Sequence, residues 1–338
     1  MIQNIFSVLT EKGCYKVILP FWEVDYIQGM LAKEGKPYEL PMLKAMSKEL
    51  LEGDLVLDVG ANIGNHTLYL SAVCGCRIIA FEPNPDLCIP LRQSIELNNL
   101  LDKVHLHEVG VGSAPGKACF SALNPENLGG QSLSIILPEQ GSIDVITLDS
   151  LAIIDTVRAI KIDVEGMELD VLKGGLELIR RDKPLLYIEA QTEGDFLGLH
   201  DLLVSSGYVY WNTFNATPTH FFIHINELTE ERIVQHCFDN GKNTYNQASA
   251  LNILKEKLKD ANDKYRHAHE QIDILKDKLA AANDKYRSVT SDYQVMKDKL
   301  CSEIEQLKLV VEDVEPKTIG VESFLLGLDF SIAEYSEG

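Results

Sequence analysis

Basic residues are scarce in this chain of 338 residues, which has 31 Lys and Arg against 51 Asp and Glu and a formal net charge of −20. Because nucleic-acid binding depends largely on Lys and Arg that neutralise phosphates, this balance argues against a nucleic-acid partner. The sequence has no run of about 18 apolar residues, so no membrane-spanning helix is expected. Its start lacks a basic segment followed by an apolar one and a cleavage site, so no secretory signal is expected.

Cysteine pairs at the spacing of metal or redox sites are also missing from the sequence. The seven cysteines are scattered, and Cys74 and Cys76 are separated by one residue, not by the two of a zinc or thiol–disulfide motif. His105 and His107 alternate along an expected strand without an identifiable third ligand nearby. We therefore expect reduced thiols, no metal site and a cytoplasmic location.

Residues 54–71, DLVLDVGANIGNHTLYLS, have the pattern of a strand, a tight turn and a helix. The apolar run ends at Gly60, and the helical pattern starts at Gly64. Because glycine has no Cβ, Gly60 permits a sharp turn, and Gly64 lets backbone approach a ligand or lets the helix pack closely on the sheet. The dinucleotide-binding turn has a further glycine where this chain has Asn62, so we expect a ligand without a pyrophosphate.

A second apolar strand, IIAFEP, ends in Glu82, 22 residues after Gly60. An acidic side chain at this interval can accept hydrogen bonds from both hydroxyls of a ribose. The turn and this carboxylate together indicate S-adenosylmethionine as the ligand. The candidate cofactor-binding residues are Asp58, Gly60, Asn62, Gly64 and Glu82. For Asp58 the alternative is a carboxylate that caps a turn or a helix.

Apolar strands and helical segments alternate up to about residue 226. Seven strands are expected, which predicts an α/β fold with a Rossmann-like, mostly parallel sheet and an antiparallel end. Helices are expected at 85–99 and from Met167 to about Gly174. The stretch at 110–144, rich in Gly and Pro, is expected to form short hairpin strands over one end of the sheet, where an acceptor can bind.

From Leu251 the sequence repeats with a period of 21 residues, which is three heptads. Apolar residues recur at spacings of three and four, at Leu251, Leu254, Leu258, Ala261, Tyr265, Ala268, Ile272, Leu275, Leu279, Ala282, Tyr286, Val289, Tyr293, Met296 and Leu300. This pattern predicts a long amphipathic helix that forms a coiled coil.

Lysines flank the apolar seam of this helix, and acidic residues lie opposite it. In a parallel homodimer we expect the flanks to face one another, so that lysine meets lysine, which favours another orientation or an acidic partner. The partner is therefore a second copy or a different protein. A helix lying on a membrane surface has the same pattern, because lysine stems can extend from the apolar boundary to lipid head groups. That alternative places the protein at the inner face of the membrane.

The motifs of residues 35–225 resemble the FkbM family of S-adenosylmethionine-dependent methyltransferases. LVLDVGANIGNHT resembles the first cofactor motif and IIAFEPNP the second, while PYELPML is similar to the usual lead-in. ITLDSL followed by IKIDVEGMELDVLKGG is similar to the distinctive strand and helix of the family. The resemblance implies a Rossmann-like sheet and methyl transfer to a hydroxyl oxygen, typically on sugars of bacterial glycans or on natural products. It does not extend to the repeated helix.

Carried over by position, the resemblance places the turn from Asp58 to Gly64 under the methionine portion of the cofactor and Glu82 on the ribose. Asp163 and Glu165 follow a strand and are expected to face the same cleft. We expect Asp163 to act as the general base or to orient the acceptor, with Glu165 in support. The alternative is that both only cap the helix that begins at Met167. Rival bases are His66, His220 and His224.

We divide the chain into four parts: a flanking or lid element at 1–52, the methyltransferase domain at 53–240, the coiled-coil helix at 250–314 and an acidic tail at 315–338. The expected function is an O-methyltransferase that acts on a sugar of a glycan or glycolipid. The alternative is a catalytically silent scaffold whose helix mediates assembly or attachment to a membrane surface.

Overall fold

The computed structural model describes residues 4–120, 133–136 and 141–312. The chain divides into two units, residues 1–235 and residues 236–338. The expected tail at 315–338 lies outside the described residues. Each unit is considered by itself.

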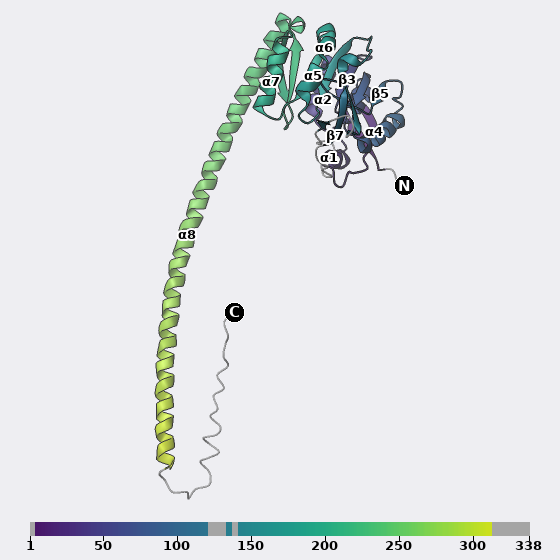
Figure 1. Ribbon diagram of the computed structural model, residues 1–338. Coiled ribbons are helices and arrows are strands. Elements are labelled where there is room, and N and C mark those ends of the chain that lie inside the picture. The colour runs from purple at the N-terminus through teal and green to yellow at the C-terminus, as the bar shows by residue number, and fades with distance from the viewer. Residues whose placement is uncertain (1–3, 121–132, 137–140, 313–338) are drawn as a thin grey trace. The chain divides into compact units, whose positions relative to one another are not determined.

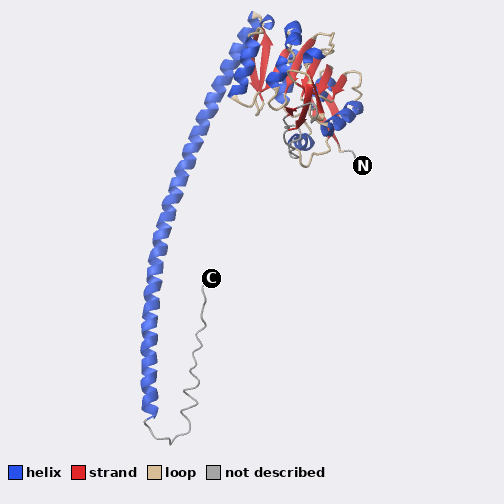
Figure 2. Cartoon of the chain, viewed as in Figure 1, coloured by secondary structure: helices blue, strands red, loops and turns tan. Residues whose placement is uncertain are grey.

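A seven-stranded sheet forms the centre of the first unit (Figure 2). Its strands, in spatial order, are β12 (Tyr208–Phe214), β13 (Thr219–His224), β11 (Leu185–Glu189), β10 (Val157–Ile162), β3 (Leu55–Val59), β4 (Arg77–Phe81) and β5 (Val104–His107). The five strands from β11 to β5 are parallel to one another, and β13 and β12 complete the sheet in antiparallel fashion. This confirms the predicted Rossmann-like, mostly parallel sheet with an antiparallel end.

Helices cover both faces of the sheet (Figure 1). On one face pack α2 (Leu40–Glu49), α3 (Asn65–Ala72) and α4 (Pro85–Leu97), and on the other pack α5 (Glu168–Lys173), α6 (Leu176–Asp182) and α7 (Glu193–Val204). Successive side chains of a strand point to opposite faces, so Val56 joins the first core and Leu57 the second. Because both faces are covered, all five residues of β3 are buried.

Local sequence signals explain most of the helix ends. The side chain of Asn84 accepts a hydrogen bond from the Asp86 backbone N–H, and Pro85 occupies the first turn of α4. Thr192 and Asp195 form a reciprocal capping box at the start of α7. The helix expected to end near Gly174 is α5, and a second short helix, α6, follows it directly.

Four short strands form a second sheet over residues 110–146, two residues beyond the expected stretch, in the order β6 (Gly110–Val111), β9 (Ile143–Ile146), β7 (Gly116–Phe120) and β8 (Leu133–Ile136). The pairing of β7 with β8 and with β9 is antiparallel, as expected for hairpin strands. The remainder of the expected hairpin region, 121–132 and 137–140, lies outside the described residues.

The N-terminal region consists of a β-hairpin and two helices. The hairpin is formed by β1 (Ile5–Thr10) and β2 (Gly13–Ile18), and α1 (Tyr26–Glu34) precedes α2. The side chain of Asp25 caps α1 by accepting from the backbone N–H of Gln28. Two short 3-10 turns, Leu148–Ser150 and Ile225–Glu227, also belong to the first unit.

The second unit contains most of α8 (Glu230–Glu312), a helix of 83 residues that begins 20 residues before the expected position 250 (Figure 1). Its apolar seam is exposed, from 46 % at Ile272 to 72 % at Tyr286. In the described parts of the chain, no helix combines the length and the apolar character that crossing a bilayer requires.

Candidate functional site

One cavity, called the main cavity below because it adjoins the turn after β3, lies where the strand order reverses, between the carboxyl ends of β3 and β10. From β3 the chain continues to β4 and β5 on one side and later returns to β10 on the other. In open α/β sheets, ligands bind in the crevice at this switch point. The cavity has a volume of about 210 Å³ and is lined by Tyr26, Ile27, Tyr38, Glu39, Gly60, Ala61, Asn62, Ile63, Asn65, His66, Glu82, Lys161, Asp163, Glu165, Glu189 and Thr217.

The turn after β3 forms one wall of this cavity, and its two glycines have different roles. Gly60 has a φ of +80°, and a Cβ there would lie 1.8 Å from the carbonyl oxygen of Asp163, so glycine permits the close approach of the two chain segments. At Gly64 a Cβ would lie 2.3 Å from Leu91 Cδ1, so this glycine permits close packing of the α3 start against α4. Gly64 does not line the cavity.

Glu82 lies at the end of β4 and is 6 % exposed. Its two carboxylate oxygens accept hydrogen bonds of 2.8 Å from the backbone N–H groups of Asn62 and Asn84. Burial raises the pKa of Glu82 to about 7, although both hydrogen bonds act in the opposite direction. Each carboxylate oxygen has a second lone pair, so Glu82 keeps the capacity to accept further hydrogen bonds from a ligand.

A smaller and mainly apolar cavity, of about 40 Å³, lies beside the first. Both cavities are lined by Gly60, Glu82, Asp163 and Glu165. The remaining walls of the smaller cavity come from Val59, Phe81, Pro83, Val109, Gly110, Val111, Phe120, Leu133, Val164 and Met167. Glu82 therefore stands between a polar cavity and an apolar one.

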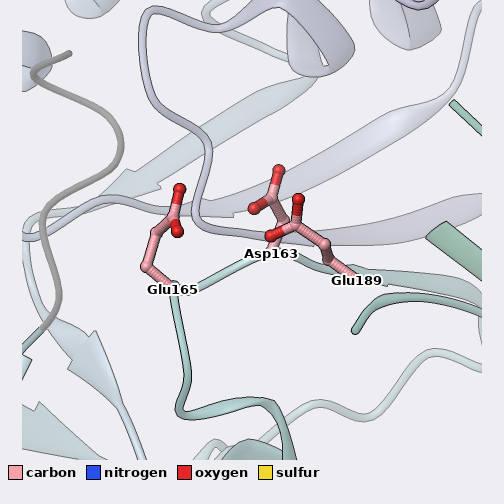
Figure 3. A group of neighbouring side chains, drawn as sticks. All are labelled: Asp163, Glu165 and Glu189. Carbon is pink, nitrogen blue, oxygen red and sulfur yellow. The ribbon is translucent and has the colours of Figure 1, made fainter. Parts of the chain in front are cut away.

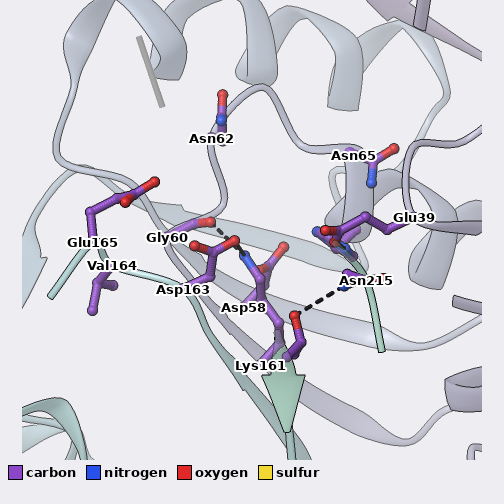
Figure 4. A network of polar contacts seen from close by, with 12 residues as sticks. Glu39, Asp58, Gly60, Asn62, Asn65, Lys161, Asp163, Val164, Glu165 and Asn215 are labelled. Carbon is purple, nitrogen blue, oxygen red and sulfur yellow. Dashed lines mark hydrogen bonds and ion pairs between the residues drawn. The ribbon is translucent and has the colours of Figure 1, made fainter. Parts of the chain in front are cut away.

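Asp58, a predicted cofactor residue, is fully buried and lines neither cavity. It accepts a 2.6 Å hydrogen bond from Thr67 Oγ1 and lies 3.5 Å from the ammonium of Lys161. Lys161 is also buried, and it donates to the Gly60 carbonyl at 2.8 Å and lies 3.2 Å from Asp163 Oδ2 (Figure 4). Asp58 therefore influences the cavity indirectly, through its ion pair with Lys161 and its hydrogen bond to Thr67 in α3.

Opposing effects set the charge states around Lys161. Burial alone would lower the pKa of Lys161, but the carboxylates of Asp163, Asp58 and Glu39 raise it above its ordinary value. Burial would likewise raise the pKa of Asp163, but Lys161 is the main group that holds it below the ordinary value. Lys161 is thus an ammonium ion, and Asp163 is ionised.

Three carboxyl groups converge beside Lys161. Asp163 and Glu165 follow β10, and Glu189 is the last residue of the neighbouring strand β11. Burial, followed by the charge of Asp163, raises the pKa values of both Glu165 and Glu189. Glu165 has a left-handed φ of +55° and accepts a 2.8 Å hydrogen bond from Gln191 Nε2.

Within the part of the chain that the structure describes, neither Asp163 nor Glu165 forms a side-chain hydrogen bond or ion pair with the start of α5, which was the alternative role for both residues. At the start of α5, the side chain of Glu168 accepts hydrogen bonds from the backbone N–H groups of Val164 and Gly166. Of the three rival bases, His66 lines the cavity and lies 3.0 Å from Glu39 Oε2. His220 and His224 line neither of the two cavities.

Sequence reasoning missed three charged residues of this cavity. Glu189 ends the strand next to β10, so the rule that selected Asp163, a carboxylate at the carboxyl end of a parallel strand, would have found it. Lys161 was detectable as a lysine inside an apolar strand, two residues before Asp163. Glu39 had no such signal, because only the tertiary fold brings it to His66.

Comparisons with known proteins relate part of the first unit to methyltransferases. Residues 58–221 match the family model of the methyltransferase FkbM domain. The hexuronic acid methyltransferase AglP of Haloferax volcanii is 29 % identical over 143 residues, which cover 40 % of this chain and 56 % of that protein. Methyltransferase 1 of Beauveria bassiana is 27 % identical over 185 residues, which cover 46 % of this chain and 73 % of that protein.

Among solved structures, methyltransferase FkbM from Methylobacillus flagellatus KT superposes with a TM-score of 0.40 at 18 % sequence identity. The superposition covers 58 % of this chain and 65 % of that one. The chain thus spans little more than half the length of AglP and just under two thirds of this structure.

Proposed function

We propose that this chain, whose residues 58–221 match the model of the methyltransferase FkbM domain, transfers a methyl group from S-adenosylmethionine to a hydroxyl oxygen of a sugar. The observation that carries the proposal is the pair of cavities that meet at Glu82 beside the turn after β3. The sugar is proposed to belong to a glycan or glycolipid, and the relative AglP, a hexuronic acid methyltransferase, supports this acceptor class.

The charges of the main cavity support a cationic cofactor. Its lining includes five carboxyl groups, those of Glu39, Glu82, Asp163, Glu165 and Glu189, against the ammonium of Lys161 and the imidazole of His66. S-adenosylmethionine has a sulfonium, an ammonium and a carboxylate and is therefore a net cation. NAD has an anionic pyrophosphate, which these carboxylates would repel.

The arrangement of the two cavities supports the same cofactor. The backbone of Gly60 to Ile63 would hold the methionine portion, and Glu82 would accept from the ribose hydroxyls. The apolar cavity would hold the adenine. Its volume of about 40 Å³ is only slightly larger than the ~30 Å³ share of one water molecule, so side chains such as Phe120 and Leu133 must move apart when a purine enters.

Bound S-adenosylmethionine would supply the methyl group, while the electron pair of the broken carbon–sulfur bond stays on sulfur. Residues of this chain would align the acceptor oxygen with that bond, an effect that can remove several kcal/mol from the barrier. Asp163, kept ionised by Lys161, would accept the hydroxyl proton or orient the hydroxyl, and Glu165 would support it. A positioned base contributes on the order of a hundredfold or more.

Elements of the N-terminal region border the cavity and support the role of a lid for residues 1–52. Tyr26 and Ile27 come from α1, and Tyr38 and Glu39 precede α2. The backbone N–H of Tyr38 donates to Asn65 Oδ1 and its carbonyl accepts from Asn65 Nδ2, both at 2.9 Å, which ties the lid to α3.

For the helix we propose pairing with a second copy, in parallel and in register, in a cytoplasmic protein. The residue just before Leu258, and before every second seam position after it, then faces the residue five positions later in the second copy. Lys257 and Lys264 thus face Asn262 and His269, and Asp292 faces Lys297. In an antiparallel pair, each lysine-rich flank faces the same flank of the second copy. The repulsion between lysines, which the sequence led us to expect in a parallel pair, therefore arises in the antiparallel pair.

Calorimetric titration tests the proposed cofactor. We expect the full chain to bind S-adenosylmethionine and not NAD, and binding of NAD alone would refute the proposal. Glu82→Ala should remove most of the affinity, whereas the control Glu96→Ala, an exposed position on α4, should retain it. Incubation with a labelled methyl donor and a panel of sugars, lipid-linked glycans and other alcohols, followed by mass spectrometry, tests the acceptor class.

A further inference from the structure

We propose that Asp163, Glu165 and Glu189 bind a divalent cation of the Mg²⁺ or Mn²⁺ type, and that this cation holds the methyl acceptor (Figure 3). The geometry and chemistry of these side chains support the cation site. Its role in holding the acceptor rests on the function proposed above.

The geometry of the three carboxyl groups fits a single ion. One oxygen from each residue can be chosen so that all three lie within 4.8 Å of one another. Two oxygens on the same ion are separated by at most twice the metal–oxygen distance, which is about 4–5 Å for hard divalent cations. The residues come from the ends of adjacent parallel strands, β10 and β11, so the sheet itself fixes their separation.

Glu189 supplies an independent sign of a missing partner. The residue is 8 % exposed, and its Oε2 receives no hydrogen bond from an amide, amine or hydroxyl donor among the described residues, while its carboxyl group lies against that of Asp163, with which it shares a hydrogen bond. Two carboxyl groups held this close together must share either a proton or a cation, because their charges otherwise repel each other. Glu189 lines the main cavity with Asp163 and Glu165, so a cation between the three groups would satisfy this oxygen.

Charge and ligand type decide which ion fits. With a cation in place of the proton that Glu189 and Asp163 share, the three carboxylates and the single ammonium of Lys161, 3.2 Å from Asp163 Oδ2, leave two negative charges, which a divalent cation balances. All three donors are oxygens, the ligands that Mg²⁺, Mn²⁺ and Ca²⁺ prefer over thiolate or imidazole. Three protein ligands leave coordination positions for water or for oxygens of a bound molecule.

The coordination positions that remain open on the cation determine which class of methyl acceptor can bind to it. An acceptor with two neighbouring oxygens, such as a vicinal diol or a hydroxyl next to a carboxylate, could occupy two of them and be held beside the turn that would bind the cofactor. A bound cation also lowers the pKa of a coordinated hydroxyl. With Asp163 on the ion, its role is to orient the acceptor, which was one of the two roles expected for it, and His66, which lines the same cavity, would accept the hydroxyl proton.

Titration of the full chain with MnCl₂, followed by the electron paramagnetic resonance signal of free Mn²⁺, tests the site. We expect saturable binding of one Mn²⁺ per chain and competition by Mg²⁺. Glu189→Gln and Glu165→Gln should each weaken binding about tenfold or more, because each removes one ligand. The control Glu193→Gln, at an exposed position just after β11, should bind as the unchanged protein does.

Two results would overturn the cation site: no saturable binding of Mn²⁺, or unchanged affinity in both ligand variants. A thermal melt of each variant shows whether a loss of binding reflects unfolding, and Glu165→Gln, the less buried position, serves if Glu189→Gln does not fold. A parallel titration with S-adenosylmethionine separates the two proposals. Cofactor binding without Mn²⁺ binding refutes only the cation, whereas Mn²⁺ binding without cofactor binding refutes the proposed function and the cation's role in it.

Discussion

Lys161 connects the buried interior of the first unit to the cavity. Asp58 is fully buried, and its Oδ1 has an ion pair with Lys161 but no hydrogen-bond partner among the described residues. The same ammonium lies beside Asp163 at the cavity wall. A change at Lys161 therefore affects both the stability of the fold and the charge of the site.

We expect Lys161→Met to lower the free energy of unfolding by about 3–5 kcal/mol, because it leaves the Asp58 carboxylate buried without a counter-ion. Urea denaturation measures the change. The control is Lys173→Met, which removes an ion pair with Asp170 that is about half exposed and should cost less than about 0.5 kcal/mol. Equal effects of the two substitutions would contradict the structural role of Lys161.

Glu82 should make cofactor affinity depend on pH. Burial raises its pKa to about 7, with a further increase from Asp58 and a decrease from Lys161, so the group is protonated below neutral pH. Because the carboxylate accepts from ribose hydroxyls better than the acid does, affinity for S-adenosylmethionine should fall as the pH drops below 7, by up to about tenfold per pH unit. Calorimetry between pH 5.5 and 8.5 measures this, and Glu82→Gln should remove the dependence.

The raised pKa of Glu82 also affects folding stability, and in the direction opposite to its effect on cofactor affinity. The folded pKa of Glu82 lies above the ordinary value of 4.5, so the folded state holds more protons than the unfolded state between these values. The free energy of unfolding contributed by Glu82 is therefore fully present below pH 4.5 and is lost as the pH rises through about 7. Stability that rises over this range in the unchanged protein but not in Glu82→Gln would contradict the assigned shift.

At the level of elements, the contact between the turn after β3 and the end of β10 is the most constrained part of the site. We expect Gly60→Ala to destabilise the fold by more than about 3 kcal/mol, because the new Cβ would overlap the Asp163 carbonyl and push the two segments apart. Gly166→Ala is the matched control: its φ of +99° is also positive, but no atom lies within 4 Å of the added Cβ.

The control should cost only the backbone strain of a non-glycine residue in this region, about 1–2 kcal/mol. Thermal melts of both variants measure the difference. If Gly60→Ala melted at the temperature of Gly166→Ala, the contact between β3 and β10 would not require glycine.

Sequence patterns predicted the elements well where the signal is local. Apolar runs predicted β3 and β4, and Asn84 with Pro85 predicted the start of α4. The division of the segment after Met167 into α5 and α6 was missed, because the Gly174–Gly175 pair was taken as an end alone. At Gly174 a Cβ would lie 2.1 Å from the Gly112 carbonyl oxygen, so this pair packs against a segment that is distant in sequence.

For the whole molecule, the proposed pairing of α8 predicts a dimer. Analytical ultracentrifugation of the full chain should show a two-chain species, because the exposed apolar seam becomes buried on pairing. Replacing Leu258 and Leu279 with Glu should give a monomer by placing charges within the seam. The control Ser291→Glu adds a charge on the side opposite the seam and should leave the dimer intact.

Orientation can be tested in the same chain. With Tyr265→Cys at a seam position, a parallel pair in register brings the two introduced thiols together, and oxidation should yield a covalent dimer. An antiparallel pair centred elsewhere would keep them apart. A monomer in solution that binds vesicles of anionic lipid would instead support the membrane-surface alternative.

The sequence by itself determined the class of sheet, the turn after β3, the carboxylate at Glu82 and the exposed heptad seam, because these depend on periodicity and on the conformational freedom of single residues. It also indicated a resemblance to the methyltransferase FkbM family, and residues 58–221 match the model of that family's domain. Only the tertiary structure decided that Asp58 lies outside the cavity and that Glu189 and Lys161 lie beside Asp163. Those positions follow from the pairing of strands that are far apart in the chain, and no local pattern specifies such pairing.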